Sequence, residues 1–188
     1  MATPRRKTPS RDAARTRSAL LDAARWLLTR RGYDQVGVRE IAARAGVDAA
    51  LVQRYFGSKK RLFEESVRGA FDVAPLLDQP GAEPLASRLA SILLEPTKDR
   101  AQFDPTLVVL RSAASEEARK PLALGLEREF IDTLATALGG GGSRVRAAAA
   151  LAVLAGFDTL RTVLGIEVLD EPEARRLLLK LLRVCVEA

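Results

Sequence analysis

Residues 38–60 read VREIAARAGVDAALVQRYFGSKK, a pattern that predicts two short helices joined by a tight turn at Gly46. Each helix has an apolar stripe of its own, made of Ile41, Ala42 and Ala45 in the first and of Leu51, Val52, Tyr55 and Phe56 in the second. Glycine permits the left-handed backbone that ends a helix abruptly, and Val47 fills the resulting corner. Two helices meeting steeply in this way form a helix-turn-helix, whose second helix fits the major groove of DNA.

The positive charge of the chain is concentrated around this stretch. The formal net charge is +6, but residues 1–68 hold sixteen Lys and Arg against seven Asp and Glu, whereas residues 69–188 have an acidic excess of three. This distribution favours an electrostatic footprint for nucleic acid over a merely solvated basic face. Residues 1–12 are predicted to be a disordered basic arm, which either reaches a minor groove or remains a tail without specific contacts.

Composition limits the class of protein further. The chain has 188 residues, 47% of them hydrophobic and 29% charged, enough for one large domain or a small domain joined to a medium one. It has no run of about eighteen apolar residues, so no membrane-spanning segment and no membrane partner are expected. Residues 4–7 are basic but lack the apolar segment of a secretory signal behind them. Cys185 is the single cysteine, which suits a reducing, cytoplasmic location.

The sequence offers little for catalysis. It contains no histidine, which removes the usual general base, the usual zinc ligand and the common nucleophilic triads. Residues 139–142 are four glycines, but no Lys-Ser or Lys-Thr follows them, so they are expected to link two helices rather than to cradle a phosphate. We therefore expect no catalytic residues, no metal site and no cofactor.

Glycines and prolines divide the rest of the chain into helices. The first helix is expected from Ala13 to Arg31, ended by Gly32, with a buried stripe of Leu20, Ala24, Leu27 and Leu28. The helix that begins after Ser58 is expected to continue through Phe71. Further helices are expected at about 84–94, 104–115, 119–138, 144–165 and 171–187. Because no stretch shows sustained period-two alternation, the prediction is an all-α protein of about nine helices.

Two side chains are predicted to cap helices in the basic region. Asp48 and Ser58 have the short polar side chains that accept from the first free backbone N–H groups of a helix. The positions that follow Ser58 are Lys59, Lys60 and Arg61, and cations there oppose the helix dipole. The arrangement is explained if a DNA phosphate binds at this helix start. The alternative is that these are long solvated side chains that bear a small penalty.

The last two expected helices indicate a homodimer. Residues 171–187 have an apolar arc too wide for one neighbouring face to cover, comprising Leu177, Leu178, Leu179, Leu181, Leu182, Val184, Cys185 and Val186. The preceding helix has small residues, Ala147 to Ala150, Ala152, Ala155 and Gly156, which let helices approach closely. Such a pair suits a two-fold, four-helix interface between two copies. Alternatively, the helices within 84–138 cover this surface inside one subunit.

Several motifs in order resemble the TetR/AcrR family of bacterial regulators. They are Thr16-Arg17, Leu20-Leu21-Asp22-Ala23-Ala24, Arg31-Gly32-Tyr33, Val38-Arg39-Glu40-Ile41-Ala42, Ala45-Gly46-Val47 and Tyr55-Phe56-Gly57-Ser58-Lys59. The resemblance implies a helix-turn-helix DNA-binding domain at 13–60 and a helical ligand-binding and dimerisation domain at 61–188. It also implies a dimer that binds a palindromic operator in double-stranded DNA and lets go when a small-molecule effector enters the C-terminal core.

Carried over position by position, the family's DNA-facing positions correspond to Arg39, Ala49, Ala50, Leu51, Gln53, Arg54, Tyr55 and Lys59. Gln53 stands where the family commonly has an aromatic residue, and its amide can bond an adenine edge in the major groove. Arg54 can bond guanine or a phosphate, Tyr55 a phosphate, and the two alanines offer only methyl contacts. Gly37 replaces the usual Ser or Thr cap, at a cost of a few tenths of a kcal/mol.

The effector site is predicted only coarsely. Plausible apolar linings are Leu89, Leu93, Phe103, Leu107, Leu110, Leu126, Phe130 and Phe157, although each fits a plain core position too. Arg111 and Arg161 lie within apolar runs, the latter near Asp158, and a buried guanidinium needs a partner. A structural carboxylate is favoured over a ligand anion for both.

These patterns lead to one favoured function and three competitors. The favoured function is a dimeric, ligand-responsive transcriptional repressor without catalytic activity. An architectural DNA binder would show little sequence preference and a strong salt dependence. A peripheral membrane protein would use residues 13–31 as a basic amphipathic helix, but it would need neither the turn at Gly46 nor the cap at Asp48. An enzyme is disfavoured by the absence of histidine.

Overall fold

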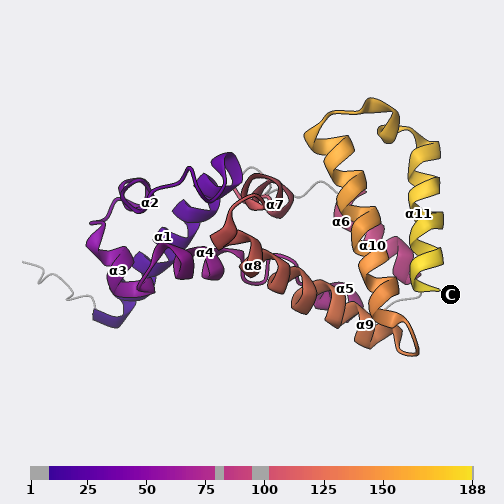
Figure 1. Ribbon diagram of the computed structural model, residues 1–188, viewed down its shortest axis with the longest axis horizontal. Helices are drawn as coiled ribbons and strands as arrows, with labels where there is room; N and C mark the ends of the chain where they lie inside the picture. Colours follow the sequence, from indigo (N-terminus) through magenta and orange to yellow (C-terminus); the bar gives the residue numbers. More distant parts are fainter. Residues whose placement is uncertain (1–8, 79–82, 95–101, 188) are drawn as a thin grey trace, which may run out of the picture. The chain divides into compact units, whose positions relative to one another are not determined.

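The computed structural model describes residues 9–78, 83–94 and 102–187. Its elements are α1 Pro9–Arg31, α2 Val38–Ala45, α3 Ala50–Phe56, α4 Lys59–Val67, α5 Ala74–Leu77, α6 Leu85–Leu94, α7 Pro105–Ser112, α8 Glu116–Gly125, η1 Leu126–Asp132, α9 Thr133–Leu138, α10 Ser143–Asp158, η2 Thr159–Val163, η3 Glu167–Asp170 and α11 Pro172–Val186 (Figure 1). The described residues form helices and connections without any strand, which confirms the all-α prediction.

The chain packs as two compact units. Of the described residues, 9–68 and 102–120 form the N-terminal unit, whereas 69–78, 83–94 and 121–187 form the C-terminal unit. Helices α4 and α7 thus pack in the same unit as the helix-turn-helix.

A close backbone approach at Gly32 explains why α7 belongs to the N-terminal unit. Gly32 has a φ of +77°, and a Cβ there would lie 2.3 Å from the carbonyl oxygen of Arg111 in α7. Only glycine combines that backbone conformation with so short a separation. The predicted end of the first helix at this glycine is confirmed, and its N–H donates to the carbonyl oxygen of Leu28 at 2.9 Å.

Hydrogen bonds reinforce the same junction. The backbone N–H of Tyr33 donates to Oγ of Ser112 at 3.0 Å, and the hydroxyl of Ser115 donates to Oδ1 of Asp34 at 2.8 Å. Oγ1 of Thr29 accepts from the backbone N–H of Asp104 at 3.0 Å. Asp104, Ser112 and Ser115 are thereby bonded to the end of α1 and to the segment that follows it.

Two predicted helix boundaries are wrong. Helix α1 begins at Pro9, so the predicted arm overlaps its first turn, where proline is tolerated because no intrahelical donor is needed; residues 1–8 lie outside the described part. Helix α4 ends at Val67 rather than continuing through Phe71. The carboxylate of Glu129 accepts from the N–H groups of Gly69 and Phe71, at 2.9 and 3.1 Å, and so satisfies donors that leave the helix.

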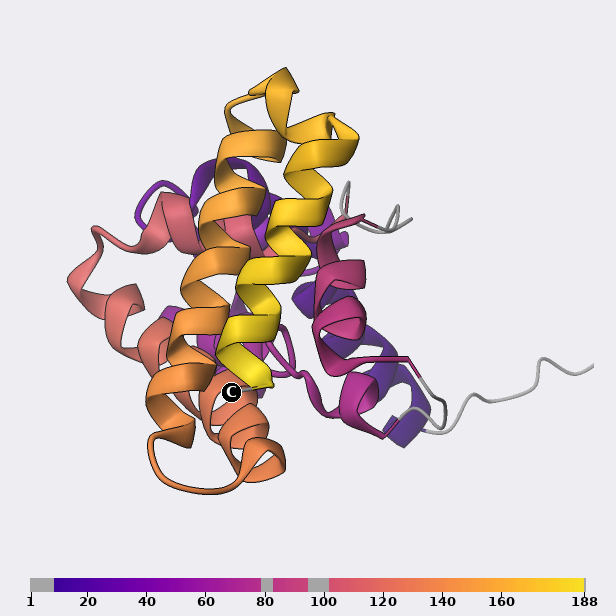
Figure 2. The same ribbon diagram turned by 90° about the vertical axis from the view of Figure 1, so that its right-hand side faces the viewer.

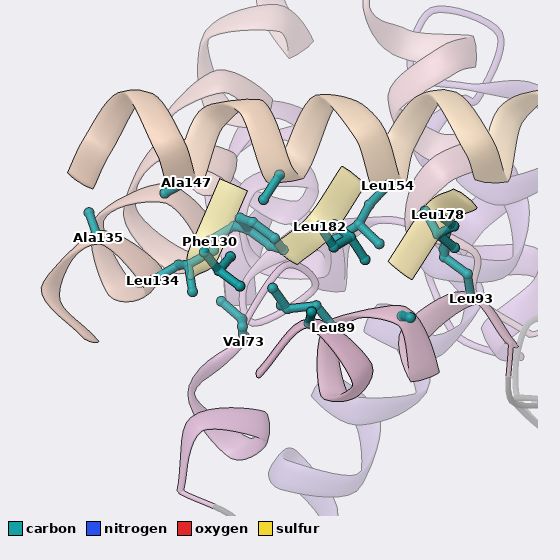
Figure 3. Close-up of a cluster of buried hydrophobic side chains, with 14 residues drawn as sticks. Val73, Leu89, Leu93, Phe130, Leu134, Ala135, Ala147, Leu154, Leu178 and Leu182 are labelled. Atoms are coloured by element: carbon teal, nitrogen blue, oxygen red, sulfur yellow. The ribbon is translucent and has the colours of Figure 1, made fainter. Parts of the chain in front are cut away.

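The C-terminal unit has its own apolar core. Helices α10 and α11 run antiparallel and side by side in both views (Figures 1 and 2). Leu178 and Leu182 of α11 are buried with Leu89 of α6 and with Phe130 and Leu134 from the η1–α9 segment (Figure 3). The predicted helix at 119–138 is interrupted, because Leu126–Asp132 winds as a π-helical turn that places Phe130 in this core.

Candidate nucleic-acid interface

The turn between α2 and α3 has the predicted geometry. Gly46 is left-handed, with φ +69° and ψ 33°. The N–H of Gly46 donates to the carbonyl oxygen of Ala43 at 3.1 Å, and that of Val47 donates to Ala42 at 3.0 Å. These bonds satisfy the last carbonyls of α2 and redirect the chain within two residues. Gly37 occupies the N-cap of α2 in an extended conformation without a side-chain bond, as expected for glycine.

Helix α3 is anchored on one face and open on the other. Oδ1 of Asp48 accepts from the N–H of Ala50 at 2.7 Å at the start of the helix, consistent with the predicted capping role. Val52 and Phe56 are buried in the unit. Ala50, Gln53 and Arg54 are exposed, whereas Ala49, Leu51 and Tyr55 are half-buried. The free face of α3 therefore presents Ala50, Gln53 and Arg54 to the solvent.

The start of α4 combines a cap with a group of cations. Oγ of Ser58 accepts from the N–H of Arg61 at 3.1 Å, which confirms the predicted cap. Lys60 and Arg61 are exposed, and Lys59 is half-buried, with its Nζ 4.2 Å from the centroid of the Tyr33 ring. The first turn of α4 contains no acidic residue that would offset these charges.

Tyr33 lies beneath Lys59 and is almost fully buried, with 2% of its surface exposed. The edge of its ring meets that of Phe63, with centroids 5.0 Å apart and an interplanar angle of 71°. Its hydroxyl donates to a carboxylate oxygen of Glu117. Burial, and then the bond to Glu117, raise the pKa of the Tyr33 phenol above its ordinary value, so the hydroxyl remains a donor.

Several arginines of α1 and α2 contact other side chains of the N-terminal unit, which composition did not reveal. The guanidinium of Arg17 pairs with Glu65, and that of Arg31 pairs with Glu40. Arg30 and Arg44 both stack on the half-exposed Trp26 ring, with guanidinium carbons 3.7 and 3.4 Å from its centroid. The exposed cations of the helix-turn-helix region include Arg39, Arg44, Arg54, Lys60 and Arg61.

Two family patterns match the chain. Residues 20–66 match the family described as bacterial regulatory proteins, tetR family, and residues 83–185 match the tetracyclin repressor-like C-terminal domain. The second match alone spans more than half of the chain. The chain belongs to the TetR family. It is accordingly a transcriptional regulator of the helix-turn-helix type, as the resemblance of its N-terminal motifs predicts.

Individual TetR-family relatives agree with this assignment. The HTH-type transcriptional regulator BetI of Agrobacterium fabrum is 32% identical over 120 residues, which cover 57% of this chain and only 56% of BetI. NalD of Pseudomonas aeruginosa, the secondary repressor of the MexAB-OprM multidrug efflux pump, matches the fold with a TM-score of 0.64 and 23% identity, over 92% of this chain and 96% of NalD. A TetR-family regulator of Streptomyces coelicolor A3 matches with a TM-score of 0.59 and 25% identity, over 98% of this chain and all of the other.

The predicted effector-site residues fall in different units. Phe103, Leu107, Leu110 and Arg111 lie in the N-terminal unit, whereas Leu89, Leu93, Leu126, Phe130, Phe157 and Arg161 lie in the C-terminal unit. The structure brings Leu89, Leu93 and Phe130 into one core, against which Phe157 packs. Leu110, by contrast, is 46% exposed.

The two arginines singled out in the sequence have partners within their own units. The guanidinium of Arg111 donates to the carbonyl oxygen of Thr29 rather than to a carboxylate. Arg161 pairs with Asp170 at 2.6 Å and donates to the carbonyl oxygen of Leu93 at 2.9 Å. Its sequence neighbour Asp158 is buried and accepts from the hydroxyl of Thr162 at 3.0 Å.

An apolar strip lies on the side of α10 and α11 away from the core. Val145 and Val184 are 74% and 71% exposed, and Leu177 and Leu181 about half exposed. These side chains belong to the two helices that run side by side in Figure 2. Single exposed hydrophobic residues are common, but several on adjacent helices mark an interaction surface.

Across residues 9–78, 83–94 and 102–187, no helix is long and apolar enough to cross a membrane. The same described residues contain no group of three or more acidic, cysteine or histidine side chains placed to hold a metal ion.

Proposed function

We propose that this TetR-family chain is a dimeric repressor that binds a palindromic operator and is released from it by a small-molecule effector in the cytoplasm. The observation that carries the proposal is the arrangement of α3. Its buried anchors, Val52 and Phe56, fix the helix in the unit, while Gln53 and Arg54 remain exposed on the opposite face. A short, anchored second helix with polar side chains on its free face is what base readout in a major groove requires.

Each DNA-facing residue has a proposed part in recognition. Gln53 reads an adenine edge and Arg54 a guanine or a phosphate, because these side chains match those donor and acceptor patterns. Tyr55 and Arg39 bond phosphates beside the groove. Ala49, Ala50 and Leu51 make apolar contacts, and Lys59 bonds a phosphate at the start of α4 together with the free N–H groups there.

The occupant proposed for the apolar strip on α10 and α11 is the same strip of a second copy. A two-fold axis would pair the two helices of each protomer into a four-helix interface. The pairing would set two recognition helices about 34 Å apart, one turn of DNA, and thereby demand a palindromic site.

The proposed effector site lies in the C-terminal unit, bounded by Leu89, Leu93, Leu126, Phe130 and Phe157, with Arg161 at its edge. The effector would act by favouring a dimer in which the spacing of the recognition helices no longer fits the operator. Two of the predicted positions in the N-terminal unit are left out of this site because they have other contacts: Arg111 donates to the carbonyl oxygen of Thr29 in α1, and the Phe103 ring centroid lies 5.4 Å from the guanidinium carbon of Arg25.

The test is a selection of random double-stranded DNA on the purified protein at physiological salt, followed by binding measurements on the enriched sequence. An enriched palindrome supports the proposal. We expect Gln53→Ala to cost about 1–3 kcal/mol on that palindrome and nothing on a scrambled duplex. Gln102→Ala, an exposed glutamine of the same unit outside the interface, is the matched control. Retained binding without any enrichment would instead support the architectural DNA binder.

A further inference from the structure

We infer that Tyr33 is a positioning residue for DNA binding, whose buried ring holds the Lys59 ammonium where it can meet a phosphate. This inference rests on the proposed function, because it explains how one of the proposed phosphate contacts is prepared. Lys59 Nζ lies 4.2 Å from the ring centroid of Tyr33, a cation–π distance.

The ring is a rigid support. The backbone N–H of Tyr33 is bonded to Ser112, its hydroxyl donates to Glu117, and its ring meets Phe63 edge to face. These contacts come from α4, α7 and α8, so the ring is fixed from several directions. A lysine held against this ring is already restricted to few rotamers. A lysine in water samples many rotamers and loses that conformational entropy when it binds a phosphate.

The ring leaves the ammonium able to bind DNA. The face of an aromatic ring attracts a cation through its quadrupole and does not pair with it as a carboxylate would. The three N–H donors of Lys59 are therefore not committed to a counter-ion by this contact. An acidic partner would fix the lysine too, but it would neutralise the charge and repel a phosphate.

The neighbouring cations show that the arrangement is particular to Lys59. Lys60 and Arg61 lie in the same first turn of α4 and are exposed, while Lys59 is half-buried against the ring. All three oppose the helix dipole. Of these three cations, Lys59 is the one that the described residues show against a buried side chain.

The experiment is a double-mutant cycle on the full chain, with binding to the selected duplex and to a scrambled duplex measured over a series of KCl concentrations. We expect Lys59→Ala and Tyr33→Leu each to weaken both duplexes several-fold and to lower the salt slope by about 0.9 per lost phosphate contact. The double variant should be no weaker than Lys59→Ala alone. Tyr33→Phe, which keeps the ring, should keep the wild-type salt slope.

The matched control pairs Tyr33→Leu with Lys60→Ala, for which the losses should add because Lys60 does not rest on the ring. If the losses of Tyr33→Leu and Lys59→Ala also add, Tyr33 acts through the fold and the inference is wrong. A wild-type salt slope in Lys59→Ala would overturn it as well.

Two further measurements keep the test decisive. If Tyr33→Leu fails to fold, phenylalanines with one to three ring fluorines at position 33 weaken the ring face without changing its shape, and DNA affinity should fall step by step. The NMR shifts of the Lys59 ε-methylene protons should lie upfield in the wild type and in Tyr33→Phe. An unshifted methylene would show that Lys59 does not lie over the Tyr33 ring. A shifted methylene in a protein that binds neither duplex would show that the proposed DNA-binding function is wrong, and the positioning role of Tyr33 with it.

Discussion

At Gly32 the backbone has a φ of +77°, and the position of a Cβ is already occupied by the backbone of Arg111. The residue therefore has two separate constraints, one conformational and one steric. Gly46 shares the first, with a φ of +69°, but a Cβ there would meet nothing within 4 Å. Comparing Gly32 with Gly46 therefore separates the free-energy cost of placing a side chain on a left-handed backbone from the cost of a steric clash with Arg111.

We expect Gly32→Ala to lower the free energy of unfolding by about 3 kcal/mol or more, because α7 must move away from the end of α1. Gly46→Ala should cost only the backbone strain, about 1–2 kcal/mol. Urea unfolding followed by the fluorescence of Trp26 measures both. Equal losses in the two variants would show that the approach of Arg111 is not limiting.

Tyr33 links stability to alkaline pH. Its phenol has a raised pKa in the folded chain and an ordinary pKa of about 10 in the unfolded chain, so its stabilising contribution is complete below pH 10 and declines above it. The decline has a limiting slope of about 1.4 kcal/mol per pH unit. We expect Tyr33→Phe to be less stable than the wild type at pH 8.5, and the difference to shrink by pH 11. A constant difference in urea unfolding across this range would contradict the shift.

At the scale of elements, the π-helical turn η1 bonds to the backbone of the segment that precedes α5. Both carboxylate oxygens of Glu129 in η1 accept backbone N–H groups of residues that follow α4, namely Gly69 and Phe71. The N–H of Val73, which precedes α5, donates to the carbonyl oxygen of Glu129 at 3.4 Å. The Glu129 side chain thus satisfies free backbone N–H groups in the segment between α4 and α5, as a capping side chain does at the start of a helix.

Glu129→Gln should destabilise the C-terminal unit by about 1–2 kcal/mol, because an amide keeps one acceptor and turns a donor toward the other N–H. Hydrogen exchange at Gly69 and Phe71 should become faster in this variant. The exposed neighbour Glu127 is the control, and Glu127→Gln should leave both measurements unchanged. Unaltered exchange in Glu129→Gln would show that these bonds do not hold the segment.

At the scale of the whole molecule, the exposed strip on α10 and α11 carries the proposed pairing of two copies. Leu181 and Val184 are exposed in the single chain, so replacing them removes no core contact. Leu178 and Leu182, on the face of α11 that meets the core, are buried. Assembly and folding of this helix can therefore be changed separately.

Light scattering should give the wild type about twice the 20.4 kDa mass of one chain. Leu181→Lys with Val184→Lys should give the single-chain mass with unchanged helical circular dichroism, because two buried charges would cost more than the interface returns. Arg183→Gln lies about 200° around the helix from Leu181 and should leave the dimer intact. A wild type that stays at the single-chain mass at micromolar concentration would refute the proposed pairing.

The features foreseen from the amino-acid pattern are those made by residues a few positions apart. The left-handed turn at Gly46, the cap of Ser58 on Arg61 and the buried stripe that includes Leu20 and Leu27 depend on spacings within one or two helical turns. Helical periodicity and backbone sterics determine such features wherever the segment lies. They were enough to indicate the helix-turn-helix and the exposed face of its second helix.

The remaining features depend on residues brought together from distant parts of the chain. The segment that precedes α5 is bonded to Glu129, the backbone of Arg111 in α7 occupies the space that Gly32 leaves, and Lys59 lies over the ring of Tyr33, which Glu117 holds. The sequence indicated Gly32 as the end of a helix, but it did not indicate that Arg111 would lie against it. Local periodicity predicts which face of a helix is buried. Which residues pack against that face is determined only by how the helices come together in the tertiary structure.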